Sequence, residues 1–494
     1  MASNYVISGT VGNLLREELS AAVRHVIENP DDPVTKGIIL NTSRVETRLG
    51  RGSLSGALTG STQFSAQHPL VFGRAGTWKY ANINRQLGTD NPPRLDVSTT
   101  YPAASDTPQR KAVWLSIGLK WMVGNLTVDE LQLLALENGA PVEDFLTQWI
   151  TDPAKTLAQQ MTTDFFGSGN GLLGTCAVSG GTGTGTWSSS ATEQTIAISG
   201  SSRPFWRGQQ VQIYDVGTGL ISTAFTVTAV HNCKNSSGYY TICLKPNASI
   251  TYTVAAGDTI HLAGAYVDGS GSGDNGVAGL GQFFINPHLS TGTKSIHGLQ
   301  VYNDSNTPPW IYPELQSYSD GVSSDRWPTP AVFERAMDDI IDRGLLPPTR
   351  WIITRGIRTL WYRTEGQFKV YSVGDGGVMR RADGGIAGPV TITTEGGEAE
   401  VIVSGFCPKN TAWGIREDAF VHYAPKGNLA VRFLGQSSLV GSGGMWLPTT
   451  YGSSSENAYT TVWQAPFQFY FERGCLAPQN LAKLTNLKEH GDTV

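Results

Sequence analysis

The 494-residue sequence is poor in cysteine and in charge, and it lacks long apolar runs. Its five cysteines are odd in number and form no CxxC pair, which argues against a disulfide framework and fits a reducing compartment. No segment reaches the roughly 18 consecutive apolar residues of a transmembrane helix, and the N-terminus lacks the basic and apolar parts of a signal peptide. We therefore expect a protein that is made and used without crossing a membrane on its own signal.

Common catalytic and nucleic-acid-binding patterns are also missing. The 36 basic and 41 acidic residues give a net charge of -5, which argues against a broad basic face for nucleic acid. No Walker A, HExxH or GxSxG motif occurs, and the GxGxxG match at residues 169–174 follows a predicted helix instead of a strand. We therefore predict no enzyme activity, no cofactor, and no catalytic or metal-binding residue.

Glycine, by contrast, is abundant. The chain has 58 glycines, but its 13 Trp, 17 Tyr and 17 Phe exclude a disordered or low-complexity sequence. Many of the glycines lie at 167–185, 269–281 and 374–388. We interpret the first two stretches as flexible linkers around a small module and the third as a mobile loop. The chain length predicts two to four packed units, or one fold with a large insertion.

The N-terminal part predicts an arm, a long loop and two helices. Residues 13–28 carry apolar side chains at helical spacing, and this helix would dock either on its own domain or on a partner chain. Residues 70–122 surround a polar, proline-rich middle that cannot build a core. Within them, β segments are predicted at 70–72, 78–81 and 112–117. A capping box at 127–130 predicts the start of one helix, and a second helix is predicted over 142–166.

After residue 185 the hydrophobic period changes to two, as in short strands. Such strands are predicted at 195–199, 211–216, 224–230, 239–244 and 259–262. Their regular spacing indicates a small antiparallel β-barrel or sandwich, and the flanking glycine stretches indicate that it is inserted into a host domain. For the rest of the host we predict a helix from 330 to Gly344, a strand at 350–354, a helix at 356–364, and strands at 400–404, 420–423, 429–433 and 459–471.

Charge is distributed unevenly. Residues 70–120 carry seven basic and three acidic side chains, a net charge of +4, whereas residues 128–166 carry one basic and seven acidic ones, a net charge of -6. The loop and the helix are therefore electrostatic complements. They could form a salt-bridged face within one chain, or the loop of one subunit could lie across the helix of the next in a head-to-tail contact that closes into rings.

The order of these parts resembles the tailed-phage major capsid proteins of the Hong Kong 97 type. The resemblance rests on the helical arm at 13–28, the basic loop at 70–120, the helix at 142–166 and the helix–strand–helix at 330–364. Shorter similar segments are Gly208–Asp215, Ala256–Ile260, Gly414–Phe420, Phe467–Arg473 and Leu476–Leu481.

The resemblance implies an α+β, Hong Kong 97-like fold with an inserted small antiparallel β-barrel. The expected parts are an N-terminal arm (1–45), an extended loop or E-loop with its flanking strands (46–125), the spine helices of a peripheral P-domain (126–175), the inserted barrel (186–266), an axial A-domain (275–410) and C-terminal strands that return to the P-domain (411–494). The long helix would be the spine helix, and 374–388 would lie near the capsomer axis.

The function implied is that of a major capsid protein, which assembles as hexamers and pentamers into an icosahedral shell around double-stranded DNA without sequence-specific binding. The expected location is the virion, after assembly in the cytoplasm of a host bacterium, with no membrane contact. Expected partners are further copies of the chain, a portal, a possible decoration protein, and a separate scaffolding protein, because the arm helix begins too early to leave room for a scaffolding segment.

The candidate site residues follow from the charge pattern and the resemblance. For the E-loop side of the subunit interface they are Arg74, Lys79, Arg85, Arg94, Arg110 and Lys111. For the spine-helix side they are Glu137, Glu143, Asp144, Asp152 and Asp164. For the capsomer-axis loop they are Asp375, Arg380 and Arg381.

Two alternatives stay open. Within the same class, the chain could form an encapsulin-like protein compartment, although its length and the β insertion speak against this. From another class, the Trp-rich β segments would also suit a carbohydrate-binding or hydrolytic enzyme, which would need a cleft with two carboxylates and Trp platforms.

Overall fold

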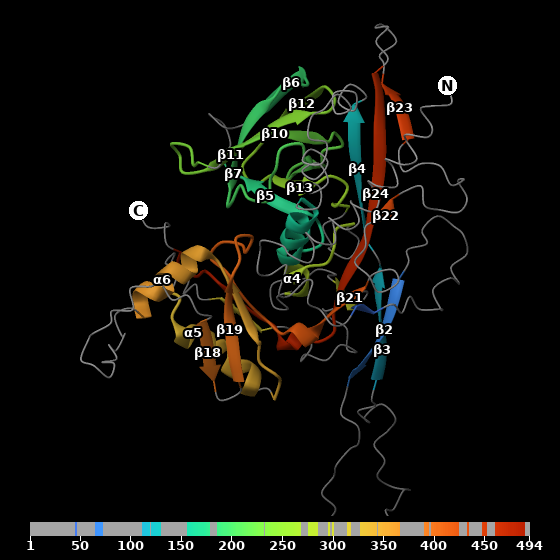
Figure 1. Cartoon of the computed structure of the whole chain (residues 1–494). Helices are drawn as coiled ribbons and strands as arrows, with labels where there is room; N and C mark the ends of the chain where they lie inside the picture. The colour runs from blue at the N-terminus through green and yellow to red at the C-terminus, as the bar shows by residue number, and fades with distance from the viewer. Residues whose placement is uncertain are drawn as a thin grey trace, which may run out of the picture.

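The computed structural model of the chain combines helices with several sheets, which confirms the expected α+β class. It describes residues 45–46, 65–72, 111–118, 120–129, 156–177, 185–231, 233–267, 275–284, 295–296, 299–300, 314–317, 327–342, 344–365, 390–394, 397–423, 432–433, 447–451 and 460–489. Figure 1 shows three groups of strands: a closed sheet at the top, a mixed sheet with two helices at the lower left, and a long ladder down the right side.

The closed sheet is antiparallel, with the strand order β10, β11, β7, β5, β13, β8, β9. The bounds are Leu172–Cys176 (β5), Gln194–Ser199 (β7), Gln210–Asp215 (β8), Gly219–Leu220 (β9), Phe225–His231 (β10), Tyr240–Pro246 (β11) and Thr259–Leu262 (β13). The sheet closes on itself because β10 pairs with β11 on one side and with β8 on the other. A further antiparallel pair, β6 (Thr186–Ser190) and β12 (Ile250–Thr253), packs on its core.

Alternating apolar residues fill the inside of this closed sheet, as the period of two predicts. Trp187 of β6 is fully buried, 5.0 Å from the ring of Phe225 and stacked on Tyr252. All five predicted strands are present, with bounds shifted by at most two residues. The interpretation of 167–185 as a linker is wrong over β5, because Leu173 and Cys176 of that strand are buried in the same core.

The mixed sheet has the strand order β16, β25, β20, β17, β19, β18. The bounds are Glu314–Ser317 (β16), Arg350–Ile353 (β17), Val390–Thr394 (β18), Gly397–Val403 (β19), Ala412–Ile415 (β20) and Ala482–Thr485 (β25). The β16–β25 and β17–β19 pairs are parallel and the others antiparallel. The sheet therefore combines strands from both sides of the boundary expected at residue 410.

Helices α5 (Pro330–Asp342) and α6 (Arg355–Glu365) share one apolar cluster with the mixed sheet. The ring of Phe333 on α5 packs edge-on against Trp351 of β17 and stacks on Trp361 of α6. Both helices and the strand between them are confirmed. Gly344, at φ 73°, adopts the left-handed conformation that ends the first helix.

The long ladder is built on β24 (Thr460–Cys475). This strand pairs antiparallel with β4 (Lys120–Asp129) over ten residue pairs, and further along with β21 (Phe420–Tyr423). Other partners in this group are β1 (Val45–Glu46) on β21, and β22 (Arg432–Phe433) and β23 (Leu447–Tyr451) on β24. The helix start predicted at Thr127 is wrong, because Thr127 lies in β4 opposite Gln464, and sheet pairing there overrides the local capping pattern.

A two-stranded hairpin continues this ladder at one end. β2 (Ser65–Phe72) and β3 (Lys111–Gly118) pair antiparallel over eight residue pairs, and β3 is followed two residues later by β4. This confirms the β segments predicted at 70–72 and 112–117. In Figure 1 the hairpin lies below the ladder, apart from the two core-forming sheets.

A helix over residues 156–166 and the short helix α4 (Leu280–Phe283) lie between the three groups (Figure 1). Phe165 and Phe283 pack against Phe420 of β21, while Phe166 and Phe284 pack against Trp413 of β20. These contacts join the ladder to the mixed sheet. The remaining short elements are β14 (Ser295–Ile296) paired with β15 (Leu299–Gln300), and the 3-10 turns η5 (Glu417–Ala419) and η7 (Pro478–Asn480).

The predicted helix at 13–28, the segment 78–81, residues 142–155 of the long helix and the loop at 374–388 lie outside the described residues. The last turns of the long helix, residues 156–166, are confirmed.

Candidate functional site

Four ionisable side chains are buried together where the helix over 156–166, β21, β24 and the segment before α4 meet. They are Asp164, His422, Glu472 and Arg473, and we call them the buried junction. His422 and Arg473 are fully buried and lie opposite each other in the β21–β24 pairing. Because a buried charge is costly unless it is paired and hydrogen-bonded, the contacts of these groups decide what the junction can do.

Arg473 is held on three sides. Its Nε donates to Nε2 of His422 (3.2 Å), its Nη1 donates to the carbonyl oxygen of Ala278 (3.0 Å), and its guanidinium lies 4.6 Å from the centre of the Phe165 ring. Because Nε2 of His422 accepts this bond, the imidazole must be neutral. Burial, together with the nearby Arg473 charge, holds the pKa of His422 well below its ordinary value, in agreement with that role.

Glu472 holds the other polar group of Ala278. The N–H of Ala278 donates to Oε1 of Glu472 (2.9 Å), and the same oxygen accepts from the N–H of Arg473 (2.8 Å). Consecutive side chains of β24 thus bind the N–H and the C=O of one residue that follows the closed sheet in sequence. The junction fastens this returning segment to β24, the longest of the described strands.

Burial also dominates the titration of the two carboxyl groups. It raises the pKa of Asp164 to about 7, against the opposing hydrogen bond from Gln160 and the charge of Arg473. It raises the pKa of Glu472 to about 7 as well, against hydrogen bonds from the backbone N–H groups of Arg473 and Ala278. The same desolvation lowers the pKa of Arg473 to about 10. The junction therefore contains carboxyl groups that change protonation near neutral pH.

Beside the junction, the two glycine stretches that flank the closed sheet pack backbone against backbone. A Cβ on Gly276 would stand 2.4 Å from the carbonyl oxygen of Gly169, and a Cβ on Gly279 would stand 2.1 Å from that of Asp164. The N–H of Gly281 donates to the carbonyl oxygen of Gly167 (3.0 Å). These glycines permit close contact, so the ends of the closed sheet are joined at a packed neck. A flexible role for 178–184 and 268–274 stays a prediction, since those residues lie outside the described part.

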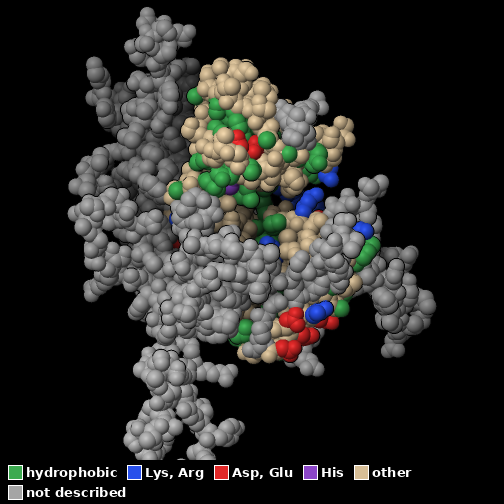
Figure 2. All heavy atoms as spheres, turned by 180° about the vertical axis from the view of Figure 1, so that it is seen from behind, with side chains coloured by type: hydrophobic (Ala, Val, Ile, Leu, Met, Phe, Trp, Pro, Cys, Tyr) green, Lys and Arg blue, Asp and Glu red, His purple; other side chains and the backbone are tan. Residues whose placement is uncertain are grey.

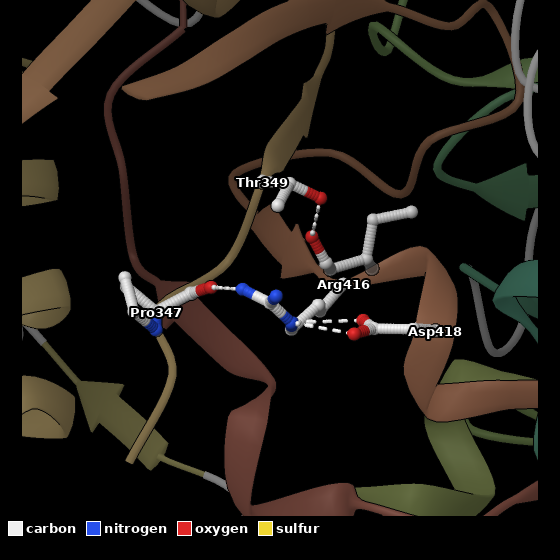
Figure 3. Close-up of polar contacts among 5 residues, drawn as sticks. Pro347, Thr349, Arg416 and Asp418 are labelled. Carbon is white, nitrogen blue, oxygen red and sulfur yellow. Dashed lines mark hydrogen bonds and ion pairs between the residues drawn. The ribbon is translucent and has the colours of Figure 1, made fainter. Parts of the chain in front are cut away.

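A second polar cluster lies on the surface of the mixed sheet (Figure 3). Arg416 forms an ion pair with Asp418 (2.8 Å) and donates from Nη1 to the carbonyl oxygen of Pro347 (3.1 Å). Thr349 donates from its backbone N–H to the carbonyl oxygen of Ile415 (2.9 Å). Nearby, Arg350 forms ion pairs with Glu400 and Glu417. This cluster ties the loop after α5 to β20 and η5, which is a structural role.

Among the predicted site residues, only Lys111 and Asp164 lie in the described part of the chain. Lys111 opens β3, opposite Phe72. Asp164 is 8% exposed and lies in the buried junction, so its carboxyl faces the interior of its own chain. The other E-loop residues (Arg74, Lys79, Arg85, Arg94, Arg110), the other spine-helix residues (Glu137, Glu143, Asp144, Asp152) and the axis-loop residues (Asp375, Arg380, Arg381) lie outside it, so the contact between loop and helix stays a prediction.

The burial of Asp164 has a signal in the sequence. It lies three residues after Met161 and seven after Leu157, on the apolar face of the helix. A carboxylate at that position predicts a buried partner elsewhere. The identity of the partner, Arg473, cannot be read from the sequence, because more than 300 positions separate the two residues.

In the described ranges, no group of three or more His, Cys, Asp or Glu side chains could hold a metal ion. No helix in the same ranges is long and apolar enough to cross a membrane.

No protein-family model matches the chain, and no curated protein matches it significantly. Several solved structures match the chain. The capsid asymmetric unit of cyanophage A-1(L) is 11% identical and covers 90% of this chain and 94% of its own, with a TM-score of 0.42. The capsid of cyanophage P-SCSP1u is 11% identical and covers 85% and 83%, with a TM-score of 0.30. The SrpI encapsulin complex of Synechococcus elongatus is 14% identical and covers 38% and 58%, with a TM-score of 0.21. The alignments with the two capsid structures span most of this chain, and the alignment with the encapsulin spans 38% of it.

Proposed function

We propose that the chain is the major capsid protein of a tailed double-stranded DNA bacteriophage. One observation carries this proposal: β2 and β3 form a two-stranded sheet with no third strand among the described residues, and it projects away from both cores (Figure 1). An isolated two-stranded hairpin is marginally stable at best in water. Such an element is expected in a chain whose hairpin is covered by a neighbouring copy.

The sequence between the two strands supports the same proposal. The 38 residues 73–110 are polar and rich in proline, and they carry five of the six candidate E-loop cations. A segment of this length and composition has little to bury within its own chain. In a shell, it would lie across the acidic spine helix of an adjacent subunit, with Glu137, Glu143, Asp144 and Asp152 as its partners.

The finer assignment follows the parts of a Hong Kong 97-like fold. The β2–β3 hairpin is the base of the E-loop, the ladder of β4 and β24 with the helix over 156–166 belongs to the P-domain, and the mixed sheet with α5 and α6 belongs to the A-domain. The closed sheet is the inserted β-barrel. We propose hexamers and pentamers in an icosahedral virion shell assembled in the host cytoplasm, with a separate scaffolding protein, a portal and possible decoration protein as partners.

Size-exclusion chromatography and negative-stain electron microscopy of the purified chain, alone and with scaffolding protein, test the proposal. We expect capsomers or shells. A chain that stays monomeric under both conditions would overturn it.

A triple charge reversal, Arg85→Glu, Arg94→Glu and Arg110→Glu, tests the loop contact separately. We expect folded monomers that no longer assemble, because the reversed loop would repel the acidic helix of its neighbour. Normal shells from this variant would refute the contact between loop and helix while leaving the shell function in place.

A further inference from the structure

Among the described residues, two lysines lie over tryptophan rings, and only one of these pairs is buried. Lys488 lies 5.0 Å from the centre of the Trp327 ring, which is 49% exposed, so water can reach the polar groups of that pair. Lys483 lies 4.3 Å from the centre of the Trp413 ring, which is only 2% exposed. The polar groups of the buried pair therefore need partners other than bulk water.

The buried pair lies on one face of the mixed sheet. Trp413 and Lys483 are opposite each other in the β20–β25 pairing. Because side chains alternate along a strand, both point away from the face that shares an apolar cluster with α5 and α6. On their own face, the rings of Phe166 and Phe284 lie 6.4 Å and 5.0 Å from that of Trp413. The tryptophan therefore lies among aromatic rings, opposite the two helices.

Both polar groups of this pair are donors without an acceptor. The indole Nε1 of Trp413 is buried and has no hydrogen-bond partner among the described residues. Lys483 is half-buried, and none of the ion pairs in the described part of the chain includes it. Burial lowers the pKa of Lys483, against the opposing effect of Cys407. Because a buried donor without an acceptor is costly, this arrangement favours a group that accepts from both.

The two donors are close enough to share one acceptor group, because Nε1 is itself an atom of the ring over which Nζ of Lys483 lies. A carboxylate has one negative charge and two oxygen atoms that each accept hydrogen bonds. One oxygen can accept from Nζ and the other from Nε1, in charge-assisted hydrogen bonds. A phosphate group, with a charge of about -2 and more oxygens, would lack donors here. The donor set therefore matches a carboxylate.

The surroundings also favour an acidic group. The guanidinium of Arg203, in the loop between β7 and β8, lies directly against Gly405, two residues before Cys407. This contact brings the closed sheet beside the mixed sheet. Figure 2 shows Lys and Arg side chains at the boundary below the closed sheet, whereas the larger groups of acidic side chains in this view lie higher on that sheet and near the lower edge.

We propose that Lys483 and Trp413 form a binding site for a carboxylate group. The carboxylate belongs either to a small carboxylic acid or to an Asp or Glu side chain of a second copy of this chain. It accepts from Nζ and Nε1, and the carbon atoms next to it contact the aromatic rings. The site goes beyond the proposed shell function and does not depend on it, because a small acid would bind the single chain as well.

A titration with sodium propionate tests the site. In the unassembled full chain with isotope-labelled tryptophan, the indole N–H signal that disappears in Trp413→Phe belongs to Trp413. This NMR signal should shift saturably with propionate but not with sodium chloride at equal ionic strength. Lys483→Met, which keeps an unbranched side chain over the ring and removes its charge, should weaken propionate binding roughly tenfold or more. No saturable shift, or equal binding by Lys483→Met, would overturn the site.

Lys488→Met is the matched control, because it removes the same charge from the pair with the exposed ring. It should bind propionate as the unaltered chain does. Urea unfolding gives a second measurement: propionate should raise the urea midpoint of the unaltered chain and of Lys488→Met, but not that of Lys483→Met. Without propionate, Lys483→Met should be at least as stable as the unaltered chain, because burial disfavours the charge that it removes.

Assembly distinguishes the two sources of the carboxylate. If a second copy supplies it, Lys483→Met should need a higher protein concentration to assemble in buffer without added acid, and propionate should have the same effect on the unaltered chain. If a free acid supplies it, both chains should assemble at the same concentration. Either result retains the site. A chain that forms no assembly under any condition would overturn the shell function and leave the propionate test as it is.

Discussion

Replacing Gly279 with alanine should break the packed neck between the closed sheet and the rest of the chain. Its backbone is extended (φ -127°, ψ -176°), which alanine adopts without strain. The added Cβ, however, would stand 2.1 Å from the carbonyl oxygen of Asp164, 2.5 Å from that of Gly167 and 2.8 Å from that of Phe165. All three atoms are backbone, so no side-chain rotation can make room, and the segment carrying Ala278 must move.

The expected loss follows from this crowding. Overpacking against a fixed neighbour costs typically 1–3 kcal/mol, and displacing Ala278 would also leave Glu472 and Arg473 without their backbone partners in a buried site. We expect a loss of about 3 kcal/mol or more in the free energy of unfolding. Denaturant titration followed by tryptophan fluorescence would measure it.

Gly167→Ala is the matched control on the opposite side of the neck. A Cβ there would meet its nearest atom, the carbonyl oxygen of Asp164, at 3.4 Å, which is ordinary contact. This variant should change the free energy of unfolding by about 0.5 kcal/mol or less. Equal stability of the two variants would refute the packed neck and favour a flexible linker.

Two further predictions concern the junction and the core of the closed sheet. Because burial raises the pKa of Glu472 from 4.5 to about 7, the folded chain binds this proton more tightly, so the stability that it contributes is fully present below pH 4.5 and is lost as the pH rises through 7. The free energy of unfolding should therefore fall between pH 4.5 and 8, and Glu472→Gln should make this fall smaller by on the order of 3 kcal/mol, as measured by urea titrations across that pH range. An unaltered pH dependence would contradict the burial of the carboxyl group. Trp187→Ala should destabilise the closed sheet by about 3–5 kcal/mol, measured by thermal unfolding, because Trp187 is fully buried, whereas Leu220→Ala at an exposed position should change it little. Equal effects would place Trp187 outside the core.

The spacing of apolar residues is enough to predict a helix or strand wherever that element buries one regular face. The strands of the closed sheet alternate apolar and polar residues, and α5 shows its stripe of Phe333, Met337 and Ile340 between a proline and a left-handed glycine. These elements were predicted within two residues of their bounds where the strand or helix is long enough for its period to be visible.

Other elements were missed because a distant partner decides their conformation. Thr127 is in a capping pattern typical of a helix start, but pairing with Gln464 of β24 places it in a strand. β5 has the composition of a linker, with Gly174 directly against the ring of Phe205, and it becomes a strand because β7 and β13 pair with it. The buried junction was missed for the same reason: its four ionisable groups come from three separate parts of the chain, around Asp164, His422 and the Glu472–Arg473 pair, and meet only in the folded protein.

The abundance of glycine is explained differently by the structure and by composition. Glycine stretches around an inserted module favour hinges when only the sequence is considered, but Gly276 and Gly279 lie where any side chain would strike the opposite backbone. The segment between them carries Ala278, whose backbone N–H and C=O are hydrogen-bonded to Glu472 and Arg473. These two residues belong to β24, which pairs with β4, and β4 begins two residues after β3 of the β2–β3 hairpin. The closed sheet and the hairpin are therefore anchored to one strand. A shift of β24 would therefore move the module and the hairpin together, and cross-linking or hydrogen exchange on an assembled particle should report correlated changes in both.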